Sequence, residues 1–468
     1  MPDSPVNAAS DGDIERYLGD TADARVESYK ALLRIPSISG IPAHAPDCRA
    51  AAEFVAADMM SAGLEHVEVC ETGGHPVVYG DWLHAAGKPT VLVYAHYDVQ
   101  PADPIDLWDS PPFVPVVKDG RMLARGASDC KCHVSMHMRA VEALIKTRGS
   151  LPINLKFVIE GEEESSSIHL DGWLEANRAR LASDFAVISD TSFFEGNLPA
   201  VTVGLRGLVY FQLDVTSSTV DLHSGVYGGA VGNPANALCA IVASMKGPDG
   251  RVLVPGFYDD VVPLTALDTQ AFADLPFDEE EYRAGIGVTL LTGEPGFTTL
   301  ERLGARPTLD VNGIWGGFEG EGPKTIIPAH AHAKISCRLV ADQDPEKIFA
   351  LLAGHIARVA PASVRYSIQR LGDGRPSLTP IENPATQAAA RALKATFGSD
   401  PLYIREGGSV PVCASFESIL GIKTVLLGFA PADGRFHAPN EWMWMSNFET
   451  GIRTIARYWS EVADLDHL

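Results

Sequence analysis

Apolar residues recur along this chain with two different spacings. Over residues 1–204, and again over 379–468, short apolar runs alternate with helical stretches. The helical spacing predicts helices over 14–34, 48–62, 133–149 and 383–398. Short β-branched or apolar runs predict strands over 90–96, 153–164, 185–190 and 424–430. This alternation favours an α/β domain with a mixed, largely parallel sheet flanked by helices.

From about residue 205 the pattern changes to one apolar residue in two, which is typical of antiparallel strands with one wet face. The same alternation returns over 329–338, and helical spacing lies between and after these strands, over 233–247 and 344–360. We therefore expect an α+β domain over 205–378, inserted into a domain built from both ends of the chain. A length of 468 residues is consistent with two domains.

Composition narrows the classes of partner. The 37 basic and 60 acidic residues give a formal net charge of −23, which argues against binding nucleic acid or an anionic membrane. No apolar run is long enough to span a membrane, and the first residues have neither the basic nor the apolar part of a signal peptide. Seven cysteines, an odd and low number, predict a reducing, cytoplasmic location.

Five candidate metal ligands lie at or after the ends of apolar runs. They are His96, Asp129, Glu164, Asp190 and His437. In parallel α/β sheets, the carboxyl ends of the strands are where sites form. Each residue alone has an ordinary explanation, such as a strand-end histidine, an N-cap aspartate or a solvated acidic loop. Together, two imidazoles and three carboxylates suit a pair of divalent cations, first of all Zn²⁺, with Mn²⁺ or Co²⁺ as alternatives.

Two further acids stand beside these ligands. Asp98 lies two residues after His96, on the same side of the strand, where it can accept the second ring N–H of that histidine. Glu163 precedes Glu164 in a run of acids that repel one another unless positive charge is present. Two cations and a spare carboxylate indicate a hydrolase that activates water.

A second metal or redox site is the alternative raised by Cys130 and Cys132, which are followed by His133 and His137. The two histidines are four residues apart and share a helix face, but a single residue between the cysteines does not match common zinc spacings. The spacing therefore favours side chains that are packed in the interior or exposed at the surface over a second metal or redox site.

The order of the candidate ligands and the wording around them resemble the dinuclear metallopeptidase family M20. This family includes aminoacylases, carboxypeptidase G2, succinyl-diaminopimelate desuccinylase and carnosinase-like dipeptidases. The resemblance runs from about residue 20 to 460 and is closest to the dipeptidase branch. It is carried by the segments AHYDVQP, DLHSGVYGG, KTIIPA and EGGSVP.

The resemblance implies a role for each residue of the candidate centre. His96 and Asp190 would hold one metal, and Glu164 and His437 the other, with Asp129 bridging the two. Glu163 would be the general base, and Asp98 would support His96. The peptide bond after Asp129 is typically cis in similar proteins. Residues 1–204 and 379–468 would form the catalytic metal-binding domain, and 205–378 a lid and dimerisation domain.

The substrate side of the site is also implied by the resemblance. The chain would be a homodimer, with His223 stabilising the oxyanion in the partner's site; the alternative is a turn histidine capped by its neighbours. Arg338 and Ser409 would hold the free carboxylate of a small peptide substrate, and Asn312 and Thr325 are weaker candidates for the same pocket. Arginine suits this task because it pairs with both carboxylate oxygens.

Three departures separate the chain from the family pattern. Cys130 and Cys132 replace the usual Asp and Gly, a Gly is missing from the serines at 165–167, and Ser377 stands where dipeptidases often have an aromatic residue. The expected function is hydrolysis of dipeptides or short peptides with a free C-terminal carboxylate. An N-acyl amino acid deacylase or carbamoylase is the first alternative, and a non-catalytic descendant of such an enzyme is the second.

Overall fold

The structure is a computed structural model that describes residues 11–408 and 410–465. The chain divides into two compact units. Unit 1 comprises Met1–Val203, Thr379–Tyr403 and Ser415–Leu468, and unit 2 comprises Gly204–Leu378 and Ile404–Ala414. The sequence-based division differs from this one over 404–414, which pack with unit 2: the backbone N–H of Arg206 donates to the carbonyl of Glu406 at 3.2 Å.

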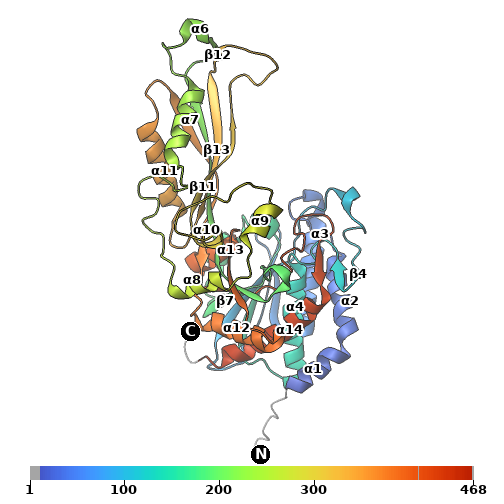
Figure 1. Cartoon of the computed structure of the whole chain (residues 1–468). Helices are drawn as coiled ribbons and strands as arrows, with labels where there is room; N and C mark the ends of the chain where they lie inside the picture. Colours follow the sequence, from blue (N-terminus) through green and yellow to red (C-terminus); the bar gives the residue numbers. More distant parts are fainter. Residues whose placement is uncertain (1–10, 409, 466–468) are drawn as a thin grey trace, which may run out of the picture. The chain divides into compact units, whose positions relative to one another are not determined.

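Unit 1 is built on a mixed sheet whose central strands are parallel (Figure 1). The strand order is β1 (Glu65–Cys70), β2 (Val77–Trp82), β6 (Asn154–Glu160), β3 (Thr90–His96), β7 (Phe185–Ile188), β17 (Thr424–Leu426), β8 (Ala200–Leu205) and β15 (Ser377–Leu378), with β16 (Leu402–Glu406) also paired with β8. The neighbours β6, β3, β7 and β17 run parallel, whereas the strands outside them pair antiparallel. The predicted fold class is confirmed.

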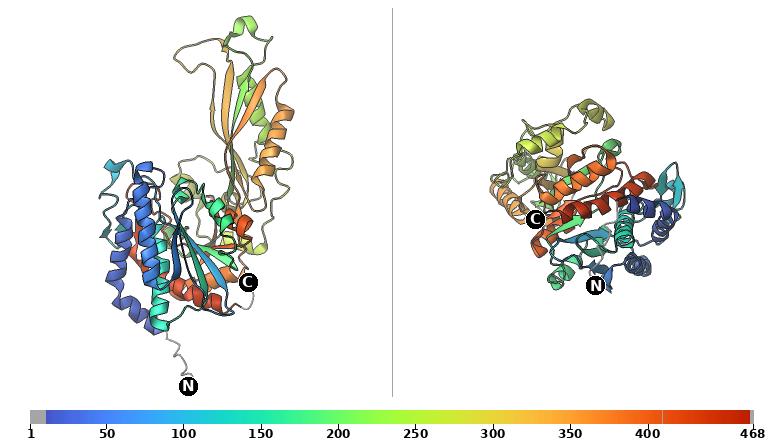
Figure 2. Two further views of the ribbon diagram at one scale, coloured as in Figure 1. Left: turned by 180° about the vertical axis from the view of Figure 1, so that it is seen from behind. Right: turned by 90° about the horizontal axis from the view of Figure 1, so that it is seen from below.

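Helices flank this sheet, as Figure 2 shows from two further sides. The helices are α1 (Asp11–Asp20), α2 (Ala22–Leu33), α3 (Ala45–Ala62), α4 (Lys131–Arg148), α5 (Leu170–Ala176), α12 (Pro384–Phe397) and α14 (Met445–Ala463). The single helix expected over 14–34 is two helices, because the backbone of Thr21 leaves the helical region (φ −109°, ψ 8°). α4 ends at Gly149, whose left-handed conformation (φ 73°) closes the helix as its sequence predicts.

Short elements shape the loops that follow the strands. β4 (Val116–Lys118), β5 (Arg121–Leu123) and β18 (Trp442–Trp444) form a small antiparallel sheet. This sheet brings the segment before α4 beside the loop before β18, since the N–H of Ala124 donates to the carbonyl of Glu441 at 3.2 Å. Single helical turns occur at Pro42–His44, Ile105–Leu107, Glu163–Ser165, Glu195–Asn197 and Phe416–Leu420.

Unit 2 is an antiparallel sheet covered on one face by two helices. The strand order is β11 (Thr308–Trp315), β13 (His330–Leu339), β9 (Gly207–Thr216) and β14 (Arg365–Gly374). Along β9, buried and half-buried residues alternate, as the sequence pattern predicts. The buried face packs against α7 (Pro234–Met245) and α11 (Pro345–Val359).

The remaining elements of unit 2 are short. β10 (Leu222–His223) pairs with β12 (Ile326–Ile327), and α6 (Ser224–Tyr227) follows β10 directly. The others are α8 (Ala266–Ala273), α9 (Glu279–Gly285), α10 (Thr299–Ala305) and α13 (Pro411–Ser415). Across the described residues of both units, every helix is too short or too polar to cross a membrane.

Candidate metal centre

The five predicted ligands lie in unit 1, at one edge of its sheet. His96 is the last residue of β3, and Asp190 follows its parallel neighbour β7 by two residues. Glu164 lies in the helical turn after β6, the other parallel neighbour of β3. Because parallel strands present their carboxyl ends at the same edge, these three side chains meet there. Asp129 enters from the segment before α4, and His437 from the loop before β18.

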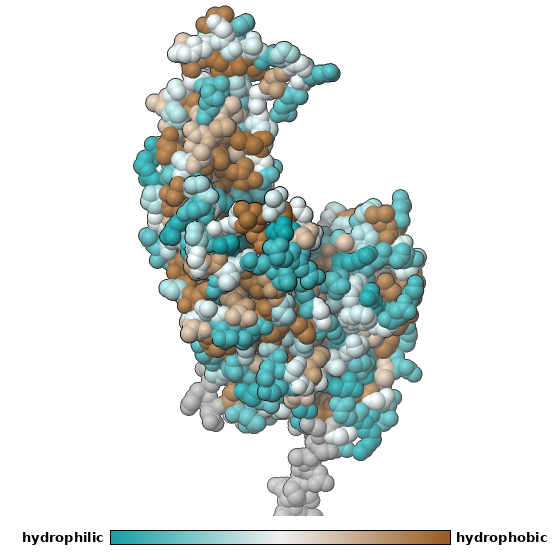
Figure 3. Space-filling view, viewed as in Figure 1, coloured by the Kyte–Doolittle hydropathy of each residue, from teal (hydrophilic) through white to brown (hydrophobic). Residues whose placement is uncertain are grey.

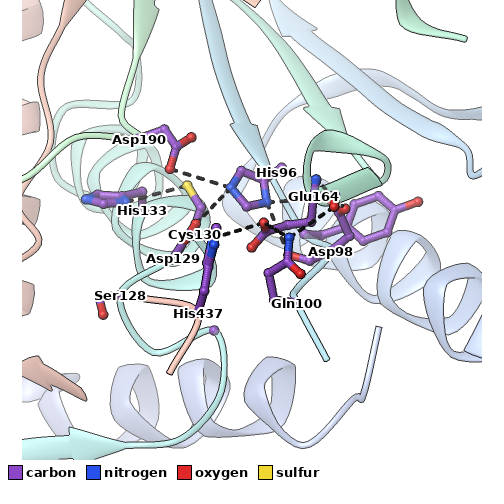
Figure 4. A network of polar contacts seen from close by, with 12 residues as sticks. His96, Asp98, Gln100, Ser128, Asp129, Cys130, His133, Glu164, Asp190 and His437 are labelled. Carbon is purple, nitrogen blue, oxygen red and sulfur yellow. Dashed lines mark hydrogen bonds and ion pairs between the residues drawn. The ribbon is translucent and has the colours of Figure 1, made fainter. Parts of the chain in front are cut away.

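Asp129 stands at the centre of this group (Figure 4). One of its carboxylate oxygens lies 3.2 Å from Nε2 of His96, and the other lies 3.0 Å from Nε2 of His437. The same nitrogen of His96 is 3.5 Å from Asp190, and the same nitrogen of His437 is 3.1 Å from Glu164. The carboxylate of Asp129 therefore faces two separate pairs of candidate metal ligands.

The groups of the centre shift one another's pKa values. Hydrogen bonds to Asp129 and Glu164 raise the pKa of His437 to about 10. Although burial acts in the opposite direction, the hydrogen bond from His437 and the charge of His96 hold the pKa of Asp129 well below its usual range. Burial is the main cause that raises the pKa of Glu163 well above its usual range, and the charges of Asp190 and Glu164 add to it.

The residues fit a pair of divalent cations. Imidazole nitrogens and carboxylate oxygens converge at contact distances, and the raised pKa of His437 shows that positive charge is favourable there. Two groups of three donors have their ligand atoms within 4.8 Å of one another: His96, Cys130 and Asp190 form one, and Asp129, Glu164 and His437 form the other.

Asp98 contacts both of its neighbours in the centre. Nδ1 of His96 lies 3.1 Å from the backbone carbonyl of Asp98 and 3.4 Å from its carboxylate, so the carbonyl is the closer acceptor. The carboxylate instead accepts the backbone N–H of Glu164 at 3.0 Å. Asp98 thus orients His96 mainly through its main chain and orients Glu164 through its side chain.

Two orienting residues were not predicted from the sequence. Glu441 is fully buried and accepts the backbone N–H groups of Gly126, Ser128 and Asp129 at 2.8–3.0 Å. Gln100 donates to the carboxylate of Glu164 at 2.9 Å. Each stands four residues after a candidate ligand, in AHYDVQP and HAPNE, and this proximity was the signal that could have found them.

The two cysteines of the segment differ in their surroundings. Sγ of Cys130 lies 3.5 Å from Nδ1 of His133 and 3.3 Å from the carbonyl of Ser189, and burial raises the pKa of its thiol to about 12. Cys132 donates to the carbonyl of Ser128 and belongs to neither group of donors. Among the described residues, no separate site combines Cys130, Cys132, His133 and His137. The Asp129–Cys130 peptide bond is cis, as the resemblance implies.

The predicted substrate residues belong to unit 2. His223 is exposed, and its Nδ1 accepts the backbone N–H of Gly225 at 2.9 Å, so it caps α6. Thr325 precedes β12, and its carbonyl accepts the N–H of Ser224 beside His223. Asn312 is exposed at an irregularity in β11, distant in register from Arg338. Ser409 lies outside the described residues.

Arg338 lies on the sheet face of unit 2 that α7 and α11 do not cover, near the end of β13. Arg206, which the sequence analysis did not select, is close enough for the charge of Arg338 to add to burial in lowering its pKa. Two neighbouring guanidinium groups make this face suitable for an anion.

Comparisons with known proteins identify relatives of this chain. The model of peptidase family M20/M25/M40 matches residues 92–461. The Cys-Gly metallodipeptidase dug1 of Schizosaccharomyces pombe is 31% identical over 459 residues, covering 95% of this chain and 96% of the relative. The Beta-Ala-His dipeptidase of Homo sapiens is 34% identical over 395 residues, covering 83% of this chain and 78% of the relative.

A solved structure extends the match to the fold. The M20 family metallo-carboxypeptidase Sso-CP2 from Sulfolobus solfataricus superposes with a TM-score of 0.80 and 30% identity, covering 94% of this chain and 99% of its own. The resemblance that the motifs carry is confirmed: this chain belongs to peptidase family M20/M25/M40.

Proposed function

We propose that this chain, a metallodipeptidase of the M20 family, hydrolyses dipeptides that carry a free C-terminal carboxylate, at a centre of two divalent cations. The observation that carries the proposal is the carboxylate of Asp129, whose two oxygens face His96 and His437 at 3.2 and 3.0 Å. A carboxylate in this position suits a bridge between two cations. When bound, the cations supply polarisation of the scissile carbonyl and a water of lowered pKa.

The ligands divide between two positions. His96 and Asp190 belong to one and Glu164 and His437 to the other, as their 3.5 and 3.1 Å contacts indicate. Asp98 holds His96 and Glu164 in place, and Gln100 holds Glu164 as well. Zinc is our first choice, with manganese or cobalt as alternatives, because the donors are imidazole nitrogens and carboxylate oxygens.

Glu163 is the proposed general base. It adjoins Glu164 in the same helical turn, and its raised pKa favours accepting a proton. Glu163 takes a proton from the attacking water and delivers it to the amine of the leaving amino acid. A raised pKa suits a glutamate that first accepts a proton and then donates it.

The resemblance points to residues that would contact the C-terminal end of the substrate. Arg338 pairs with the C-terminal carboxylate, supported by the anion-favouring face that it shares with Arg206. Asn312, Thr325 and Ser409 are proposed as further contacts in this pocket. A requirement for this carboxylate restricts cleavage to the last peptide bond of a substrate.

We further propose a homodimer through unit 2. Apolar atoms gather over α6 and β12 (Figure 3), where Val220, Val226 and Tyr227 expose 62%, 68% and 44% of their surface. β11 is an edge strand of the sheet. Exposed apolar patches and open edges of this kind are typical of interfaces. In the dimer, His223 stabilises the oxyanion in the site of the partner subunit.

A subunit-mixing experiment tests the dimer and the role of His223 together. Glu163→Gln and His223→Ala are each expected to be inactive. In hybrid dimers one site combines the intact Glu163 with the intact His223, so mixing equal amounts should restore about a quarter of wild-type activity. If the mixture stays inactive although sedimentation shows hybrid dimers, His223 acts in its own subunit or only caps α6.

A substrate panel tests the function itself. Zinc- or manganese-loaded protein is offered dipeptides, tripeptides, dipeptide amides and N-acyl amino acids. Cleavage of dipeptides alone supports the proposal. Cleavage of only N-acyl amino acids identifies a deacylase, and turnover of longer peptides identifies a carboxypeptidase. Bound metal without any turnover identifies a non-catalytic protein. We place the enzyme in the cytoplasm, on the odd and low number of cysteines.

A further inference from the structure

Cys130 brings a sulfur atom to the position of one proposed cation. Its Sγ and the ligand atoms of His96 and Asp190 lie within 4.8 Å of one another. The thiol and His96 are both fully buried, whereas Asp190 is 15% exposed. Figure 4 shows the sulfur beside Asp190 and His96, on the side of the centre away from Glu164. Sulfur, nitrogen and oxygen donors at this spacing suit a single zinc ion.

His96 gives an independent reason to place a ligand here. Its Nε2 is buried yet makes no hydrogen bond to any of the described residues. That nitrogen points at Asp129 and Asp190, 3.2 and 3.5 Å away, and so into the same group. A buried polar atom without a hydrogen bond is costly, and a bound cation satisfies it.

His133 directs a hydrogen-bond donor at the sulfur of Cys130. The backbone N–H of Phe429 donates to Nε2 of His133 at 3.0 Å, so Nε2 is an acceptor and the ring proton of the neutral imidazole sits on Nδ1. Nδ1 lies 3.5 Å from Sγ of Cys130 and directs its N–H at the sulfur. An N–H donor of this kind is the outer-shell contact that orients and stabilises a metal-bound thiolate.

We propose that Cys130 is a thiolate ligand of the cation held by His96 and Asp190. The inference rests on the proposed dinuclear centre. On binding, the S–H bond breaks, the Sγ–metal bond forms, and the proton leaves to solvent. The competing explanation is a buried thiol whose S–H donates to the carbonyl of Ser189 at 3.3 Å. Both explanations use Sγ of Cys130. They differ in whether this sulfur binds the metal or keeps its proton and donates to Ser189.

The ligand set changes which metal this position prefers. Thiolate is a soft donor that suits zinc, whereas manganese prefers oxygen ligands. We expect Cys130→Ser to weaken zinc binding at one of two positions by at least the 10- to 100-fold that loss of an outer-shell partner typically costs. Manganese affinity should change much less. Cys130→Asp, which restores the residue usual in the family, should shift the preference towards manganese.

X-ray absorption at the zinc edge tests the inference without relying on activity. Protein loaded with two zinc ions should show a sulfur shell at about 2.3 Å, averaging about half a sulfur per zinc, beside nitrogen and oxygen at about 2.0–2.2 Å. Cys130→Ser should lose this shell. Cys132→Ser is the matched control and should keep it, because Cys132 is equally buried, lies in the same segment and belongs to neither donor group.

The possible outcomes show whether the role of Cys130 fails alone or the proposed dinuclear centre fails with it. Two bound zinc ions with only nitrogen and oxygen shells overturn the role of Cys130 and leave the dipeptidase proposal standing. A sulfur shell that survives Cys130→Ser also overturns it, because another cysteine then supplies the sulfur. Fewer than two bound metals together with no turnover overturns the dinuclear centre, and the inference with it.

Discussion

Replacing Glu441 with glutamine should destabilise the protein far more than the loss of one charge suggests. One carboxylate oxygen accepts the backbone N–H groups of Ser128 and Asp129 at 2.8 and 3.0 Å. The other accepts from the guanidinium of Arg125 at 2.7 Å and from the N–H of Gly126 at 2.9 Å. Arg125 is 1% exposed and Glu441 is 0% exposed, so water cannot replace these contacts.

The magnitude follows from the number of donors left without an acceptor. The amide oxygen of glutamine can keep two of the four bonds, but its NH₂ group then faces Arg125 and Gly126, which are both donors. Each buried donor that loses its acceptor costs about 1–3 kcal/mol, and breaking a buried ion pair costs about 3–5 kcal/mol. We expect Glu441→Gln to lower the free energy of unfolding by about 3–5 kcal/mol, a large part of the stability of a typical domain.

Urea unfolding followed by circular dichroism, in EDTA and in zinc, measures this loss. Glu417→Gln is the control, because Glu417 forms an exposed pair with Lys423 whose removal should change stability by less than about 0.5 kcal/mol. Replacing Arg125 and Glu441 together with apolar residues should cost less than the sum of the single losses, because no buried charge remains unpaired. A loss below about 1 kcal/mol for Glu441→Gln would refute the reasoning.

Three further predictions concern the centre and the substrate. Glu163→Gln should keep both metals, measured by atomic absorption, but lose about 10²- to 10⁴-fold in turnover; undiminished turnover contradicts its role as base. In the metal-free protein, the raised pKa of His437 means that its contacts with Asp129 and Glu164 stabilise the fold below about pH 6.5, and that this stabilisation disappears as the pH rises to about 10. The difference in unfolding free energy between wild type and His437→Ala should shrink over that range, and a difference independent of pH contradicts the pairing. Arg338→Met should raise KM for dipeptides roughly 10- to 100-fold, as the loss of a charged hydrogen bond predicts, and an unchanged KM contradicts the contact.

The sequence predicts the centre well where regular strands determine position. His96, Glu164 and Asp190 follow parallel neighbours, so the ends of their strands had to meet at one edge. The outer limits of elements were less predictable: the strand expected over 153–164 ends at Glu160, and a helical turn then turns Glu164 towards His437. The spacing of apolar residues does not predict that turn, because the turn depends on contacts such as the hydrogen bond from the N–H of Glu164 to Asp98.

Residues that act through long-range contacts were the ones missed. Glu441 touches the segment before α4 across more than 300 positions of sequence, and the small sheet of β4, β5 and β18 helps to bring the two together. The direction of the Cys130 side chain was hidden for the same reason, since the carbonyl of Ser189 contacts its sulfur from 59 positions away in the sequence. The sequence analysis treated Cys130 as a departure from the family pattern and favoured a packed or surface residue over a metal ligand. Its surroundings favour another explanation, in which the substitution gives the metal position held by His96 an additional ligand while the five other predicted ligands are retained.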